Sequence, residues 1–386
     1  MNPLPRVVLA AHARPREGGL GLNFAHMLAG LEGAFEVETF SPTSMPGVSD
    51  HTVAIPAWIG AAFRWPGVRR LRALHANLIE TAFDRHVARA LPPCAVFQGL
   101  TGHCEHSLAR AKALGAGTLL DVVTVHDDEG NLRVAREMAA FGVRFRPDRT
   151  QGARRRREYA AADRIRVMSH HARETFLQRG FDPERVVVVS PPIETEQFPA
   201  ATFRHDRFRV TFIGRLEVGK AFHHVVEAFR AARLPDSELV LWGGSGSREV
   251  ARYLREHVTP HPAIHVRPVP IRDAGLDEVF GKSHVIVHPS VADGFGYVVA
   301  EAMASGVPVI VSTTTGGRDW VIDGHNGFIV PVGDRDALRE RLAWCHRHSA
   351  RLPELGRAAR ATAVSRSLAR FREDYLPLIR SLIRPA

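Results

Sequence analysis

The chain has 386 residues, of which 45% are hydrophobic, and its 51 basic and 41 acidic side chains leave a formal net charge of +10. This length predicts two domains of about 150 to 200 residues, each with its own core. No apolar run approaches the roughly 20 residues of a membrane-spanning helix, and the N-terminus lacks a signal-peptide layout, so we expect a cytoplasmic protein. Charge alone does not distinguish nucleic acid, phosphate-bearing substrates and an anionic membrane surface as partners.

The three cysteines, Cys94, Cys104 and Cys345, are widely spaced and odd in number, which excludes a disulfide framework and a zinc site built on thiols. We expect them to be buried packing residues. Asp334-Arg335-Asp336 is the only acid-x-acid triplet worth testing as a metal binder, but its place at the start of an expected helix indicates capping, and the histidines at 103 and 106 have the irregular spacing of an ordinary loop. The sequence therefore predicts no metal site.

Short apolar runs recur along the first half of the chain, each separated from the next by enough residues for a helix. They predict strands at 7–11, 95–99, 118–125, 165–169 and 186–190. Runs that are apolar throughout indicate strands buried on both faces, and alternation with helices indicates parallel sheets.

The second half repeats this pattern. Strands are predicted at 209–214, 239–244, 285–290, 307–312 and 328–332, with helices such as 221–232 and 297–305 between them. A Pro-containing acidic stretch at 191–203 separates the two series and is the expected linker. The fold class is therefore α/β, with two doubly wound domains.

In such sheets ligands bind beyond the carboxyl ends of the strands, so the loops there should carry the chemistry. The first such loop runs from Gly214 to Lys220. Arg215 and Lys220 can converge on a pyrophosphate, the arginine through its forked N–H groups and the lysine as a point charge. Lys220 is also one of only three lysines in the chain. A solvated loop with two incidental cations is the alternative for this segment alone.

A second loop, 293–301, follows a strand and runs into a helix. Its two glycines let the backbone approach a ligand closely, and the N–H groups at the start of the helix favour an anion. Asp293 and Glu301 place two carboxylates eight residues apart, and one positioned like Glu301 can accept hydrogen bonds from two vicinal hydroxyls. A helix cap followed by a surface glutamate is the alternative.

Together the two loops resemble the retaining glycosyltransferases of family 4. The family's hallmark is an acid, seven residues and a glutamate around a Gly-Phe-Gly loop, preceded by a Gly-Arg-Leu segment and a lysine. Further segments that resemble the family lie at 158–169, 188–198, 315–317 and 323–328. The resemblance implies the GT-B fold, two Rossmann-like domains facing across a cleft. Residues 1–198 would form the acceptor-side domain and 199–370 the nucleotide-sugar domain, and 371–386 a helix returning to the first.

The resemblance also implies roles for individual residues. Arg215 and Lys220 would hold the donor diphosphate, Glu301 would bind the ribose, and Asp293 would face the hydroxyls of the transferred sugar. The family usually has glutamate at the first acid, so the shorter Asp293 bears on sugar preference. The expected donor-binding residues are Gly18, Gly19, Gly214, Gly294, Phe295, Gly296 and Tyr297.

The first half adds two candidates. The Gly18-Gly19 loop after the first strand resembles the family's glycine-rich loop, and it lacks the full spacing of a dinucleotide fingerprint, which argues against hydride transfer. His126, after strand 118–125, matches a position where many family members place a histidine beside the reacting sugar. A catalytic role and a structural role both remain open for His126.

These features predict a retaining, metal-independent hexosyltransferase without a cofactor. Its donor would be a UDP- or GDP-sugar, and its acceptor a glycan, a lipid-linked molecule or a small molecule. Trp58, Phe63 and Trp65 lie among arginines, a mixture compatible with peripheral contact at the inner membrane face. A nucleotide-sugar epimerase or a glycosyl phosphorylase on the same scaffold is the alternative. A nucleic-acid-binding protein is a remote one, since it would not explain the acid pair in a glycine loop.

Overall fold

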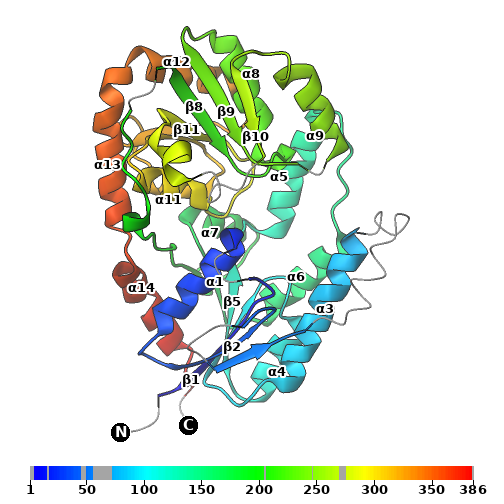
Figure 1. Cartoon of the computed structure of the whole chain (residues 1–386). Helices are drawn as coiled ribbons and strands as arrows, with labels where there is room; N and C mark the ends of the chain where they lie inside the picture. Colours follow the sequence, from blue (N-terminus) through cyan, green and yellow to red (C-terminus); the bar gives the residue numbers. More distant parts are fainter. Residues whose placement is uncertain are drawn as a thin grey trace.

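The computed structural model describes residues 4–14, 17–44, 49–54, 72–203, 206–245, 247–268 and 275–384. It contains two parallel sheets, one in each half of the chain. Figure 1 shows them as two lobes, with the N-terminal half below and most of the C-terminal half above. The expected α/β architecture of two doubly wound domains is thus confirmed.

The first sheet has seven parallel strands in the order β3-β2-β1-β4-β5-β6-β7. They are β1 (Arg6–Ala10), β2 (Glu36–Ser41), β3 (Ser49–Thr52), β4 (Val96–Leu100), β5 (Gly117–Val122), β6 (Arg164–Val167) and β7 (Val186–Val188). The helices of this half are α1 (Gly18–Leu31), α3 (Arg72–Ala90), α4 (Glu105–Ala113), α5 (Asp127–Ala140), α6 (Arg149–Ala161) and α7 (His170–Leu177).

The second sheet has six parallel strands in the order β10-β9-β8-β11-β12-β13. They are β8 (Phe208–Ile213), β9 (Ser237–Trp242), β10 (Ile264–Arg267), β11 (Val285–His288), β12 (Val309–Ser312) and β13 (Gly327–Val330). The helices are α8 (Phe222–Ala232), α9 (Arg248–Tyr253), α11 (Tyr297–Ala304), α12 (Arg335–Arg347), α13 (Leu352–Val364) and α14 (Leu368–Ser381). This strand order reverses direction between β8 and β11, as in dinucleotide-binding domains.

Apolar runs become central strands because both faces of each sheet are covered. In β1, Val8 and Ala10 point into one core, whereas Val7 and Leu9 point into the other. The three strands that the sequence did not predict, β2, β3 and β10, lie toward the edges of the sheets. β3 has the sequence Ser-Asp-His-Thr, so all of its side chains are polar, and it joins the sheet through backbone pairing with β2. These strands show no continuous apolar run, so the sequence pattern gave no signal for them.

The end of the chain returns to the first domain as α14, which lies below α13 at the lower left of Figure 1. Phe371, Tyr375 and Ile379 of α14 share a core with Phe24 and Met27 of α1. Gly30 completes this contact, because a Cβ atom there would lie 2.6 Å from the Phe371 ring. The helix expected at 371–386 is therefore α14, which begins at Leu368.

A buried ion pair fixes the centre of the first domain. Arg166 of β6 and Asp121 of β5 are both fully buried and lie 2.6 Å apart. Arg166 also donates to Asn23 of α1 and to the carbonyl of Val189. The network ties the middle of the sheet to the helix that follows the first strand.

Candidate active site

The two loops that the sequence predicted to carry chemistry meet at the carboxyl end of the second sheet. The short helix η3 (Val218–Lys220) is held against the loop after β11 through the Gly219 carbonyl. This oxygen accepts hydrogen bonds from Ser290 Oγ and from Val291 N, both at 3.1 Å. As a result, Lys220 Nζ lies 2.5 Å from Asp293 Oδ2.

The same carboxylate oxygen has a second partner. His288 Nε2, at the end of β11, lies 2.9 Å from Asp293 Oδ2. Burial alone would raise the pKa of Asp293, but the Lys220 ammonium and His288 bring it below its ordinary value. Asp293 is therefore an ionised carboxylate, held by a cation on one side and an imidazole on the other.

The glycine loop after Asp293 is wedged between the domains. A Cβ atom on Gly294 would lie only 2.3 Å from the Val123 carbonyl oxygen, at the end of the first sheet. Ser169 Oγ, from the loop before α7, donates to the Gly294 carbonyl at 2.6 Å. Gly296 has a φ of +83° and stands at the N-cap of α11. Only glycine allows both the close backbone approach at 294 and the left-handed turn at 296.

The N-terminus of α11 faces the glycine pair of the first domain. A Cβ atom on Gly19 would lie 3.4 Å from the Tyr297 ring. The ring centroids of His26 and Tyr297 are 5.9 Å apart. One helical turn after Tyr297, Glu301 lines a pocket of about 90 Å³ between α1 and the linker. Gly18 and Gly19, which were predicted to lie in a loop, instead begin α1, and this helix faces Tyr297 and Glu301 of the second domain.

Three other expected donor-site residues have different surroundings. Arg215 is 77% exposed and pairs with Glu217 at 3.2 Å, so its guanidinium stands apart from the Lys220–Asp293 pair. Phe295 is buried against Trp320, which leaves its main chain for a ligand. Gly214 has a φ of +142° at the end of β8, a conformation that favours glycine.

The side chain of His126 packs into an aromatic cluster of the first domain. Its imidazole is buried among Tyr159, Phe176 and Phe181, with ring centroids 5.0 to 5.6 Å away. Its Nδ1 accepts a hydrogen bond from Asp128 N and so caps α5. Burial lowers the pKa of His126, which keeps the ring neutral. These contacts describe the structural role that the sequence left open.

The sequence did not point to two histidines near Asp293. The first is His288, which ends an apolar strand five residues before Asp293. This position was the only signal for it in the sequence. The second is His171 of α7, whose side chain is 4% exposed. Burial and then Arg318 lower the pKa of His171 to about 4, while Asp293 acts in the opposite direction. Its Nε2 is buried and has no hydrogen-bond partner among the described residues.

The remaining expectations concern metals, thiols and membranes. Asp334 accepts from Ala337 N at 2.8 Å and caps α12, as predicted. The three cysteines are free, and two of them are buried. Within the described part of the chain, no helix is both long and apolar enough to cross a bilayer. Trp58, Phe63 and Trp65 lie outside the described residues.

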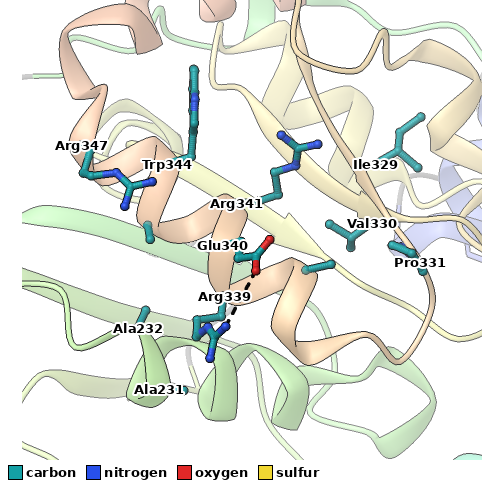
Figure 2. A pocket seen from close by; sticks show the side chains of 12 residues that line it. Ala231, Ala232, Ile329, Val330, Pro331, Arg339, Glu340, Arg341, Trp344 and Arg347 are labelled. Atoms are coloured by element: carbon teal, nitrogen blue, oxygen red, sulfur yellow. Dashed lines mark ion pairs between the residues drawn. The ribbon is translucent and has the colours of Figure 1, made fainter.

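A further groove, of about 730 Å³, runs along α12 beside the end of β13. Figure 2 shows Arg339, Arg341 and Trp344 on its walls, with Arg339 paired to Glu340. None of the predicted site residues lines this groove, so it is separate from the Lys220–Asp293 site.

Comparison with known proteins finds a family model that matches this part of the chain. Residues 193–362 match the model of the glycosyl transferases group 1. D-inositol 3-phosphate glycosyltransferase from Xylanimonas cellulosilytica is 29% identical over 238 residues, 55% of this chain and 54% of that protein. The capsular polysaccharide biosynthesis glycosyltransferase CapM from Staphylococcus aureus is 30% identical over 145 residues, 36% of each. The chain thus spans about half the length, or less, of these relatives.

Solved structures resemble the whole chain. HepE from Anabaena, in complex with UDP-glucose, has a TM-score of 0.71 at 14% identity and covers 98% of this chain and 100% of its own. Sucrose-phosphate synthase from Thermosynechococcus elongatus has a TM-score of 0.73 at 20% identity, covering 98% and 99%. These likenesses show the GT-B fold. The segment that holds Lys220, Asp293 and Glu301 is thus similar to the glycosyl transferases of group 1.

Proposed function

We propose that the chain is a retaining, metal-independent glycosyltransferase that moves a hexose from a UDP- or GDP-sugar to an acceptor. The observation that carries this proposal is the ionised Asp293 held against Lys220 at the start of α11, where the two domains meet. The HepE structures solved with UDP and UDP-glucose support a nucleotide-sugar donor.

Breaking the sugar–phosphate bond leaves negative charge on the departing diphosphate. Lys220 and the N-terminus of α11 are the positive groups already at the site, and the exposed Arg215 side chain can join them. A diphosphate that reaches Lys220 must share it with Asp293. Asp293 then accepts hydrogen bonds from the hydroxyls of the sugar in place of part of its contact with the Lys220 ammonium. Glu301 accepts hydrogen bonds from the ribose hydroxyls.

Retention would follow if the acceptor attacks from the side that the diphosphate leaves. Gly294 and Ser169 hold the domains in contact beside Asp293, and this closure would exclude water that could hydrolyse the donor. The relatives' names refer to D-inositol 3-phosphate and to capsular polysaccharide. The acceptor therefore stays within the proposed range of glycans, lipid-linked molecules and small molecules, with peripheral membrane contact through 58–72 for a lipid-linked one.

Calorimetric titration with UDP, GDP and ADP in the presence of chelator tests the proposal. We expect one nucleotide to bind selectively, and Lys220→Ala and Glu301→Ala to weaken that binding by roughly tenfold or more each, since each removes a charged contact. Lys282→Ala is the matched control, because this lysine pairs with Glu278 in another part of the second domain. Absence of binding to all three nucleotides would refute the proposal.

Product analysis separates the transferase from its alternatives. A transferase forms a glycosylated acceptor and free nucleoside diphosphate, with the anomeric configuration retained. An epimerase changes the donor sugar without acceptor, and a phosphorylase consumes inorganic phosphate. The same incubation with and without acceptor therefore distinguishes the three.

A further inference from the structure

Three side chains with metal-binding atoms meet where α5 of the first domain contacts the second. Glu137 lies on α5, and His223 and His224 lie in the first turn of α8. Nε2 of each histidine is 2.8 Å from the same oxygen, Oε1 of Glu137. Within the described residues, this is the one group of three or more such side chains whose ligand atoms lie within 4.8 Å of one another.

The cluster is almost closed to solvent. The side chains of His223, His224 and Glu137 are 2%, 4% and 13% exposed. Figure 1 shows α5 reaching from the lower lobe toward the upper one, where it contacts η3 immediately before α8. The three groups are thus buried by the docking of one domain on the other.

The backbone before the two histidines is arranged for this convergence. Successive residues of a helix point about 100° apart, yet both imidazoles reach one carboxylate oxygen, with ring centroids 4.4 Å apart. Ala221, the N-cap of α8, has a φ of +54°, in the left-handed region that non-glycine residues rarely adopt. A costly conformation of this kind persists only where the surrounding structure requires it.

We propose that Glu137, His223 and His224 bind a Zn²⁺ ion that joins the two domains. Two imidazole nitrogens and one carboxylate oxygen are a donor set that Zn²⁺ prefers, with a fourth position left for solvent, whereas Mg²⁺ and Ca²⁺ favour oxygen ligands. In a tetrahedral site with bonds of 2.0 to 2.2 Å, ligand atoms stand about 3.3 Å apart. The present 2.8 Å separations need to open by only about 0.5 Å to admit the ion.

Such an ion would act on the donor site from outside it. His223 follows Lys220 by three residues, so a metal at α8 would anchor the segment that carries Lys220 to the first domain. None of the three ligands belongs to the proposed donor-binding group. The ion would therefore act on the donor site only through the position of this segment, and the proposed metal site stands whether or not the proposed transfer reaction is correct.

Cobalt substitution of the full chain tests this site directly. After chelator treatment and desalting, we expect one equivalent of Co²⁺ to give the visible absorption bands of a tetrahedral ion, and Zn²⁺ to displace it stoichiometrically. Glu137→Gln, which keeps the size of the side chain, and His224→Ala should each weaken Zn²⁺ binding by roughly 100-fold or more, because each removes one of three ligands. His257→Ala, on an exposed histidine of the same domain, is the control and should bind as the wild type does.

Thermal unfolding provides an independent readout. Zn²⁺ at a hundredfold excess over its dissociation constant should raise the Tm of the wild type by roughly 5 °C and leave that of Glu137→Gln unchanged. Failure of the wild type to bind either ion, or equal binding by the ligand variants, would overturn the proposal. Neither measurement uses a nucleotide or a sugar, so its failure is distinct from a failure of the proposed function.

Discussion

Gly294 is the residue at which a single methyl group should separate the two domains beside the candidate active site. The added Cβ of Gly294→Ala would lie 2.3 Å from the Val123 oxygen and 2.7 Å from Thr124 Cα, whereas ordinary contacts begin at 3.4 Å. Both neighbours are backbone atoms, so no side-chain rotation relieves the clash. The loop or the domains must move by about 1 Å to restore a normal contact.

This displacement falls on the residue next to Asp293. A misplacement of about 1 Å at a reacting centre costs on the order of 100-fold in rate, or about 2.7 kcal/mol of barrier. We therefore expect Gly294→Ala to lower kcat/KM for sugar transfer about 100-fold. It should remain folded at 25 °C, because overpacking costs about 1 to 3 kcal/mol of stability.

The assay is steady-state transfer with the donor nucleotide identified by calorimetry, together with nucleotide affinity and Tm. Gly244→Ala is the matched control, because a Cβ atom there has no neighbour within 4 Å. The reasoning is wrong if both Gly294→Ala and the control Gly244→Ala retain the kinetics and the nucleotide affinity of the wild type. It is also wrong if the two variants lose activity equally.

Three further predictions concern buried or paired charges. Lys220→Met removes the cation that helps to lower the pKa of Asp293, so the acid limb of the pH–rate profile should move to higher pH. The control Lys282→Met should keep the wild-type profile. If the acid limb does not move in Lys220→Met, Asp293 does not control that limb. Asp121→Asn leaves the buried Arg166 charge unpaired and should lower the free energy of unfolding in urea by about 3 to 5 kcal/mol. Glu36→Gln, at the exposed ion pair with Arg6, should lower it by under about 1 kcal/mol. Equal losses of stability in the two variants would contradict this prediction. Burial raises the pKa of Glu158 to about 7 from 4.5, so the folded state keeps its proton longer than the unfolded chain does. The free energy of unfolding should therefore fall by about 3 kcal/mol as pH rises from 4.5 through 7, and Glu158→Gln should flatten that slope, which denaturation at pH 5 and 8 can check.

Local sequence patterns were sufficient for the central strands and for the position of the two chemical loops. Strands such as β1, β8 and β11 are buried on both faces, so most of their residues are apolar, and that is visible in four to six residues. Parallel strands align their carboxyl ends, which is why loops at 214–220 and 293–301, far apart in the chain, were expected on one edge. The structure brings Lys220 of the first loop to Asp293 of the second.

Three strands without a continuous apolar run, and the orientation of single side chains, could not be predicted from these patterns. β3 and β10 are edge strands held largely by backbone pairing, and β2, although paired on both sides, mixes polar and apolar residues, so none of the three shows a continuous apolar run. His126 has the strand-end position that its family resemblance suggested. The direction of its ring, however, depends on Tyr159 and Phe176, which come from two later helices.

What the sequence determined by itself is the series of buried strands, the two-domain α/β class and the acid, glycine and lysine positions that mark the family. The tertiary structure alone decided the contacts between the domains: Ser169 and Val123 against Gly294, and Glu137 between His223 and His224. The physical reason is the distance along the chain over which each kind of interaction acts. Burial and backbone geometry act on neighbouring residues and leave a periodic record, whereas contacts between residues about 86 positions apart exist only after two separate cores have docked.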